Sequence, residues 1–134
     1  MSMKISFPGN KKVAVEFDGR TVLSDQPQEA GGDGSAPAPF ELFLASIGAC
    51  AGYFVLSFCQ KRGIATDGVE LTQDVVWNEA EHRVEQINVD ILLPASFPVK
   101  YRDAVVGAAN LCTVKKHLLA PPKLEVRAVS KAVR

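Results

Sequence analysis

The sequence predicts an α+β fold, and three observations lead to this prediction. Stretches typical of strands and of helices occur in separate runs, whereas a parallel β/α fold would alternate them. One helical stretch, residues 39–63, is long and apolar on nearly every side. The stretches around it are short, alternate apolar and polar residues, and are bounded by turn residues, as in antiparallel sheets. We expect antiparallel sheets wrapped around a long central helix, in a single domain spanning residues 1–134.

Three short strands open the chain, at residues 4–7, 12–17 and 20–24. The dipeptide Asp18-Gly19 between the second and third is a strong signal for a two-residue hairpin turn. A loop rich in glycine and proline follows and contains the sequence GGDGS. This loop lacks the lysine and the spacing of a phosphate-binding P-loop, so we interpret it as a connection rather than a nucleotide site.

The central helix is expected to begin at Pro39, because proline suits a first helical position, and to stop at Gly63. Glu41 is its only charge between residues 40 and 59. A helix this apolar either spans a membrane or is buried on every side, and the Gly48-x-x-x-Gly52 motif would suit a packed membrane pair. Since its flanks read as soluble strands, we expect it to be enclosed by protein and not to enter a membrane.

The second half of the chain predicts two long strands, at residues 69–77 and 84–93, joined by a polar loop. Residues 99–109 then read as a helix, and residues 111–119 as another helix or its kinked continuation. Pro121 and Pro122 end this helical region. A last strand is expected at residues 123–129, with Leu124, Val126 and Ala128 on one face.

Composition excludes several classes of function. The 134 residues carry a formal net charge of zero, so we expect no nucleic-acid partner and no attraction to an anionic membrane. The N-terminus has no apolar signal segment, which favours a cytoplasmic protein. The three cysteines do not form a secreted disulfide framework, and neither they nor the two isolated histidines have zinc-site spacing. We therefore expect no metal and no cofactor.

The cysteines divide into a possible pair and a bystander. Cys50 lies mid-helix among small residues, and Cys112 lies near the start of a late helix. Cys59 is nine residues beyond Cys50, half a turn out of phase, so these two cannot bond without unwinding the helix. Cys50 with Cys112 is thus the sterically open choice for any disulfide. The alternative is that all three are inert core residues, since free cysteine is often buried.

Three segments together resemble the OsmC/Ohr family: PFELFLASIGAC, the helix end CQKRG, and the second cysteine in CTVKKHL. The resemblance covers most of the chain. Family members fold as α+β homodimers whose subunits wrap around each other, with two long helices packed at the centre. Many reduce organic hydroperoxides with a thiol pair. The resemblance therefore implies an OsmC-like fold and an intertwined homodimer.

Carried over from the family, Cys50 corresponds to the peroxidatic cysteine and Cys112 to the resolving one. The implied partners are a small-molecule hydroperoxide and an external thiol reductant. Family peroxidases also use an arginine near the N-terminal hairpin, for which Arg20 is the nearest candidate, although an exposed hairpin arginine would look the same.

These peroxidases use a glutamate that directly follows a proline at the start of the long helix. Here Phe40 follows Pro39, and Glu41 comes one position later. Glu41 either holds the arginine or caps the helix. We expect Cys50, Cys112, Arg20 and Glu41 to form a catalytic site for thiol-dependent hydroperoxide reduction in oxidative-stress defence. The alternatives are an OsmC-like dimer that binds a small apolar or thiol ligand without peroxidase activity, and a buried-thiol dimer of unassigned chemistry.

Overall fold

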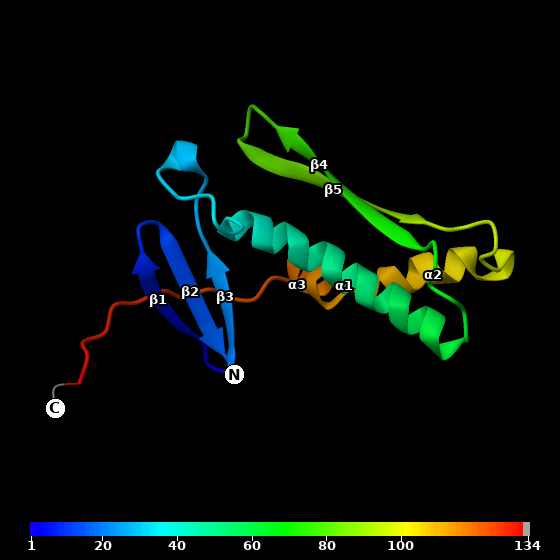
Figure 1. Ribbon diagram of the computed structural model, residues 1–134, viewed down its shortest axis with the longest axis horizontal. Helices are drawn as coiled ribbons and strands as arrows, with labels where there is room; N and C mark the ends of the chain where they lie inside the picture. Colours follow the sequence, from blue (N-terminus) through cyan, green and yellow to red (C-terminus); the bar gives the residue numbers. More distant parts are fainter. Residues whose placement is uncertain (133–134) are drawn as a thin grey trace. The chain divides into compact units, whose positions relative to one another are not determined.

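The computed structural model describes residues 1–132 and has an α+β fold with small sheets and a long helix (Figure 1). These residues form two compact units. The first unit comprises Met1–Ala49 and Thr72–Val89, and the second comprises Cys50–Leu71 and the chain from Asp90 onward. Each unit is described by itself below. The single domain over residues 1–134 stays a prediction.

The three-stranded sheet of the first unit agrees with the sequence prediction. Strands β1 (Lys4–Gly9), β2 (Lys12–Phe17) and β3 (Arg20–Ser24) pair antiparallel in the order β1-β2-β3. The turn between β2 and β3 has Asp18 and Gly19 at positive φ, 47° and 72°. A type I′ hairpin turn requires this left-handed backbone at both central positions, which explains the Asp-Gly pair.

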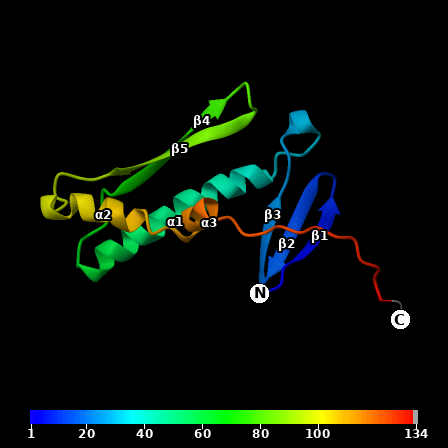
Figure 2. The ribbon, with the colours of Figure 1, turned by 180° about the vertical axis from the view of Figure 1, so that it is seen from behind.

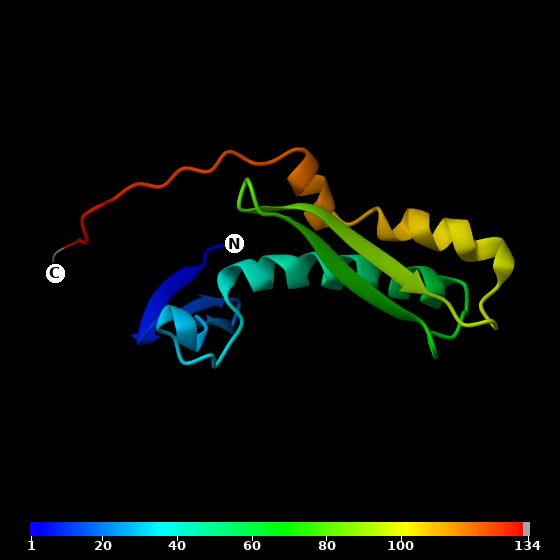
Figure 3. The same ribbon diagram turned by 90° about the horizontal axis from the view of Figure 1, so that it is seen from above.

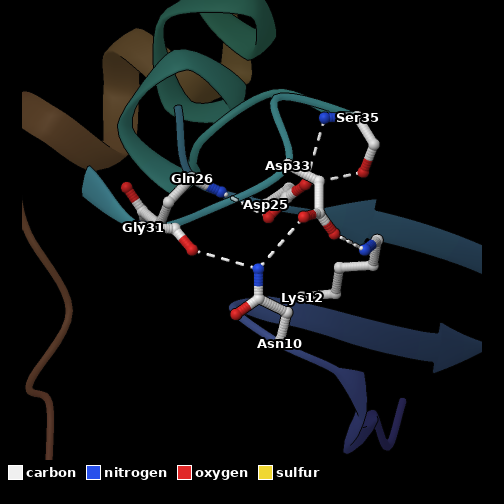
Figure 4. A network of polar contacts seen from close by, with 7 residues as sticks. All are labelled: Asn10, Lys12, Asp25, Gln26, Gly31, Asp33 and Ser35. Carbon is white, nitrogen blue, oxygen red and sulfur yellow. Dashed lines mark hydrogen bonds and ion pairs between the residues drawn. The ribbon is translucent and has the colours of Figure 1, made fainter. Parts of the chain in front are cut away.

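A polar network holds the loop after β3 in one shape (Figure 4). Asp25 is buried at its centre. One carboxylate oxygen accepts hydrogen bonds from the Ser35 hydroxyl, at 2.6 Å, and the Ser35 amide, at 3.0 Å. The other accepts from the Gln26 amide at 2.8 Å. The bonds from Ser35 in particular lower the pKa of Asp25 from 3.8 to about 2, because they stabilise its charged form.

The same loop is bound to the hairpin formed by β1 and β2. Lys12 on β2 forms an ion pair with Asp33. The Asn10 side-chain amide donates to the Gly31 carbonyl at 3.0 Å and to the Asp33 carboxylate at 3.1 Å. The sequence indicated a connection without saying whether it is ordered, and these hydrogen bonds show an ordered one whose polar groups fix its own backbone.

Replacing Asp25 with asparagine should destabilise the first unit at neutral pH, because one of the amide or hydroxyl donors would then face an NH₂ group. The pKa of Asp25 is lower in the folded protein than in the unfolded chain. The carboxylate therefore stabilises the folded state above about pH 4, and this stabilisation disappears as the pH falls towards 2. The difference between wild type and Asp25→Asn in urea unfolding midpoint should thus narrow over that window. A difference independent of pH would contradict the assigned role.

Helix α1 (Pro39–Lys61) has the predicted start and stop. At its start, the Glu41 carboxylate accepts a hydrogen bond of 3.0 Å from the Ala38 amide, which is half of a capping box. At its end, Gly63 has a φ of 63°, its amide donates to the Gln60 carbonyl, and the Ile64 amide donates to the Cys59 carbonyl. These two bonds form a Schellman motif, in which only glycine adopts the left-handed position without strain.

By length and composition alone, α1 could also cross a membrane. Within one chain the expectation that α1 is enclosed on every side is wrong, since 28% of its apolar window is buried. Its second half contributes to a core. Its side chains Val55, Phe58 and Cys59 pack with Phe97 and Val105 in the buried core of the second unit. The absence of a membrane partner stays a prediction.

The remaining elements follow the predicted order as far as residue 119. Strands β4 (Glu70–Asn78) and β5 (Arg83–Leu92) form a two-stranded sheet. A short 3₁₀ turn, Val99–Tyr101, leads into α2 (Arg102–Ala109), and α3 (Thr113–Leu119) follows. The sequence left open whether the last two helices are one kinked helix. They are two, separated by a turn at residues 110–112 (Figure 2).

The predicted last strand, residues 123–129, is a wrong prediction for the single chain. In the described part of the C-terminal segment, residues 120–132, the backbone is extended and belongs to no sheet (Figure 3). Leu124 and Val126 are 87% and 91% exposed. An alternating sequence becomes a strand only when a neighbouring edge supplies its hydrogen bonds, and none of residues 1–132 does so here.

Candidate thiol site

Two of the three cysteines meet in the second unit. Cys50 is half-buried on α1, and Cys112 is buried in the turn between α2 and α3. Both are free thiols. The two thiols lie near enough for each to shift the pKa of the other. The structure therefore brings together the two residues that the sequence paired.

Cys112 is the N-cap residue of α3. Its sulfur accepts a hydrogen bond of 3.3 Å from the Lys115 amide, and its carbonyl accepts one of 3.1 Å from the Lys116 amide. Its own amide donates to the Ala109 carbonyl at the end of α2. Cysteine is not among the preferred N-cap residues, but its sulfur occupies the place that a serine hydroxyl would take.

The pKa of Cys50 lies below its ordinary value of 9.0. Burial alone would raise this pKa, because it disfavours the thiolate. Hydrogen bonds from the Val114 amide, the Cys112 thiol and the Thr113 amide lower it and together outweigh burial. A cysteine with a lowered pKa is the one that reacts as a nucleophile, since the thiolate is the reactive form.

The pKa of Cys112 is shifted in the opposite direction. Burial raises it, the Lys115 amide partly offsets burial, and the hydrogen bond and charge of Cys50 raise it further. The first proton to leave the pair therefore comes from Cys50. Cys112 is the thiol that is favoured to keep its proton, because burial and the neighbouring Cys50 raise its pKa. Opposite shifts in two neighbouring thiols define a nucleophile and a proton donor.

Cys59 is separate from this pair. It is fully buried in the core of the second unit, and burial raises its pKa, with the nearby Arg62 charge opposing. The Arg62 guanidinium stacks 3.7 Å from the centroid of the Phe58 ring and donates to the Phe58 carbonyl. A buried, protonated thiol is unreactive, in agreement with the bystander expected from the helical phase.

Arg20 and Glu41 both lie in the first unit, and the structure does not join them. Arg20 is exposed at the start of β3, opposite Phe17. Within residues 1–132, no ion pair includes Arg20. Glu41 is bound to the Ala38 amide at the start of α1. Of its two possible roles, helix capping is the one seen.

With this geometry known, comparison with other proteins identifies the family. Residues 32–127 match the OsmC-like protein family. The chain belongs to the OsmC family. A search of curated proteins gave no match.

Solved structures support the OsmC fold. A protein from Psychrobacter arcticus 273-4, described as an osmotic stress induced and detoxification response protein, has a TM-score of 0.72 at 19% identity, covering 87% of this chain and 86% of that one. The organic hydroperoxide resistance protein OsmC of Legionella pneumophila has a TM-score of 0.56 at 21% identity. The match covers 88% of this chain and 89% of that one. For OhrB of Bacillus subtilis, an organic hydroperoxide resistance protein, the TM-score is 0.51 at 17% identity, with 90% and 93% covered.

The sequence did not indicate that backbone amides at the start of α3 lower the pKa of Cys50. The sequence placed Cys112 inside a helix over residues 111–119, whereas in the structure it is the N-cap residue just before α3. Lys115, Lys116 and His117, which follow Cys112, are exposed, and the Lys115 ammonium group donates to Asn110. Among the residues that the structure describes, no group of three histidine, cysteine or acidic side chains could hold a metal.

Proposed function

We propose that this OsmC-family protein reduces organic hydroperoxides with the thiol pair Cys50 and Cys112. The observation that carries the proposal is a pair of free thiols in the second unit that shift each other's pKa values in opposite directions. Names of fold neighbours from Legionella pneumophila and Bacillus subtilis, both organic hydroperoxide resistance proteins, support the substrate class. A cytoplasmic location fits the proposal, because cellular thiols there would reduce the oxidised pair.

The reaction has two steps. The Cys50 thiolate attacks one peroxide oxygen, the O–O bond breaks, and the leaving alkoxide takes the Cys112 proton to become an alcohol. Cys50 is then a sulfenic acid. The Cys112 thiolate attacks its sulfur and hydroxide leaves, so the products are an alcohol, hydroxide and a disulfide. An external thiol returns both cysteines to the reduced state by thiol–disulfide exchange.

We also propose a homodimer in which the α1 helices of two copies pack together. Exposed residues recur on α1 at every third or fourth position: Ala45, Ala49, Tyr53 and Leu56. Tyr53 is 61% exposed, and Gly52 beside it has no atom within 4 Å of where a Cβ would stand. A small-residue stripe flanked by exposed apolar side chains is typical of a helix that packs closely against another helix.

One observation favours a second candidate, an OsmC-like dimer that binds a small apolar or thiol ligand without reducing peroxides. Phe40 follows Pro39 where family peroxidases have the glutamate, Glu41 is used as a helix cap, and Arg20 has no carboxylate partner within residues 1–132. The apparatus that assists the peroxidatic cysteine in such enzymes is thus incomplete in one chain. Peroxide turnover separates the two candidates.

The test is to add one equivalent of cumene hydroperoxide to the reduced protein and to follow free thiols and alcohol product. We expect loss of two thiols per chain and one alcohol formed, with peptide mapping showing a Cys50–Cys112 crosslink. Cys50→Ser should lose the reaction, whereas Cys59→Ser should keep it. A crosslink that contains Cys59, or an overoxidised Cys50 beside a free Cys112, would refute the assigned roles.

Arg20 should contribute more to peroxide turnover than Glu41. A carboxylate one position further along the helix cannot hold a guanidinium in the same bidentate geometry, and here it binds the Ala38 amide. We expect Arg20→Met to lower the rate of thiol loss and Glu41→Gln to leave it within about twofold, because a glutamine at this position can still accept the bond from the Ala38 amide. An inactive Glu41→Gln beside a normal Arg20→Met would reverse this order.

A further inference from the structure

The C-terminal segment is extended and belongs to no sheet, yet residues 123–129 have the sequence of a half-buried strand. Apolar residues at even positions alternate with charged residues at odd positions: Leu124, Val126 and Ala128 against Lys123, Glu125 and Arg127. All of these side chains are exposed. What the segment lacks is a sheet edge that would accept its backbone hydrogen bonds and cover its apolar face.

Four strands within residues 1–132 have an open edge. They are β1 and β3 in the three-stranded sheet, and β4 and β5 in the two-stranded sheet. An open edge presents unpaired amides and carbonyls to which another strand can add. The two-stranded sheet gains most from an added strand, because a lone pair of strands is marginally stable in water.

Charge spacing selects β4 among these four edges. Glu70 and Asp74 on β4 are exposed and four residues apart, so they lie on one face of the strand. Lys123 and Arg127 in the C-terminal segment have the same spacing with the opposite charge. β1 and β3 each contain one basic and no acidic residue, and the two acids of β5 are five residues apart, which places them on opposite faces of a regular strand.

One antiparallel register satisfies both charges on β4. Setting Glu70 opposite Arg127 also sets Asp74 opposite Lys123, because both pairs are four residues apart. Opposite charges that face each other across two strands stabilise the pairing, whereas like charges destabilise it.

The same register matches the other face of β4. Val126 falls opposite Leu71, and Leu124 falls opposite Gln73 and diagonal to Val75. Val75 is 43% exposed, so this end of the face has apolar surface that an added strand would cover. Charged and apolar residues of the segment thus each meet their own kind of partner on β4.

We propose that residues 123–129 of one copy add as a strand to the open edge of β4 in a second copy, and that two copies exchange these segments reciprocally. The occupant is a second copy because the segment of the same chain stays unpaired although the β4 edge is open (Figure 3). A two-fold dimer makes each such contact twice. This interaction surface goes beyond the proposed function and depends neither on peroxide reduction nor on the α1 contact.

Charge reversal separates exchange between copies from pairing within one chain. The tail variant, Lys123→Glu with Arg127→Glu, and the β4 variant, Glu70→Lys with Asp74→Lys, each place like charges opposite one another when the variant is alone. If the two variants are mixed in urea and refolded together, a mixed dimer has opposite charges in both exchanged contacts. Mixing cannot restore a pairing that forms within one chain.

The readout is hydrogen exchange of peptides covering residues 123–129, corrected for intrinsic rates, at micromolar protein. In wild type these amides should exchange about tenfold more slowly than in either variant alone, and the refolded mixture should recover the wild-type protection. The matched control, Lys11→Glu with Lys116→Glu, changes the net charge as the tail variant does, at two exposed positions outside the segment. It should keep the wild-type protection.

Four results would overturn the proposal. They are free exchange of residues 123–129 in wild type, protection that survives the reversal on β4, a control that loses protection as the tail variant does, and a mixture that stays unprotected. The last of these would show that the segment pairs within its own chain. No hydroperoxide is used, so a protein that fails to reduce peroxides can still show the exchange, and one that reduces them can lack it.

Discussion

Replacing Gly32 with alanine should lower the free energy of unfolding by about 3 kcal/mol, near the upper end of the cost of overpacking. A Cβ at this position would lie 1.9 Å from the Gln26 carbonyl oxygen and 2.5 Å from its carbon. These are backbone atoms, so no side chain can move aside. The loop would have to open and lose the hydrogen bond of 3.0 Å from the Gly34 amide to Gln26.

Gly34→Ala is the matched control in the same loop. Gly34 has a φ of 65°, so alanine there is strained, but the nearest atom, on the flexible Gln28 side chain, is 4.0 Å away. We expect it to cost about 1–2 kcal/mol, the price of a left-handed backbone alone. Urea unfolding followed by circular dichroism measures both. If Gly32→Ala is no more destabilising than Gly34→Ala, the close approach of Gly32 to Gln26 is not part of the folded loop.

Where local chemistry decides a feature, the sequence predicted it. Pro39 and Gly63 bound α1 because each has a backbone preference that few other residues share. The Asp18-Gly19 turn follows for the same reason. The pairing of Cys50 with Cys112 was expected because helical phase excludes a bond between Cys50 and Cys59, and because the OsmC/Ohr resemblance assigns a role to both residues.

Features that depend on tertiary partners were not predictable. Asp25 accepts hydrogen bonds from Ser35, ten residues further along the chain. The loop between them has no repeating pattern from which this contact could be predicted. The amides of α3 that lower the pKa of Cys50 come from a segment more than sixty residues further along the chain. The segment 123–129 has a strand pattern but no pairing edge within residues 1–132, because a pattern specifies a face and not the neighbour that covers it.

The two glycines of the Gly48-x-x-x-Gly52 motif look equivalent in the sequence but differ in the structure. A Cβ at Gly48 would lie 3.0 Å from the Gln73 side-chain oxygen, whose amide nitrogen donates to the Leu44 carbonyl. The absence of a side chain at Gly48 thus leaves space for the Gln73 side chain of the same chain. A Cβ at Gly52 would meet nothing within 4 Å. A single chain gives no reason for glycine at position 52, and a second copy packed on α1 would.

Gly52→Leu should therefore weaken the proposed homodimer by about 1–3 kcal/mol, which is roughly a fivefold to 150-fold increase in its dissociation constant. If this face of α1 were in water, the same change should stabilise the protein, because leucine is a better helix former than glycine by several tenths of a kcal/mol or more. The sign of the effect thus decides whether Gly52 lies at a helix contact.

Gly107→Leu in α2 is the matched control. Gly107 is exposed, and a Cβ there would also meet nothing within 4 Å. Sedimentation at micromolar concentration should give about twice 14.4 kDa for wild type and for Gly107→Leu, and a smaller mass for Gly52→Leu. Urea unfolding should show Gly107→Leu as more stable than wild type and Gly52→Leu as less stable. A monomeric wild type, or a Gly52→Leu variant that gains stability as the control does, would show that α1 does not pack against a second copy through Gly52.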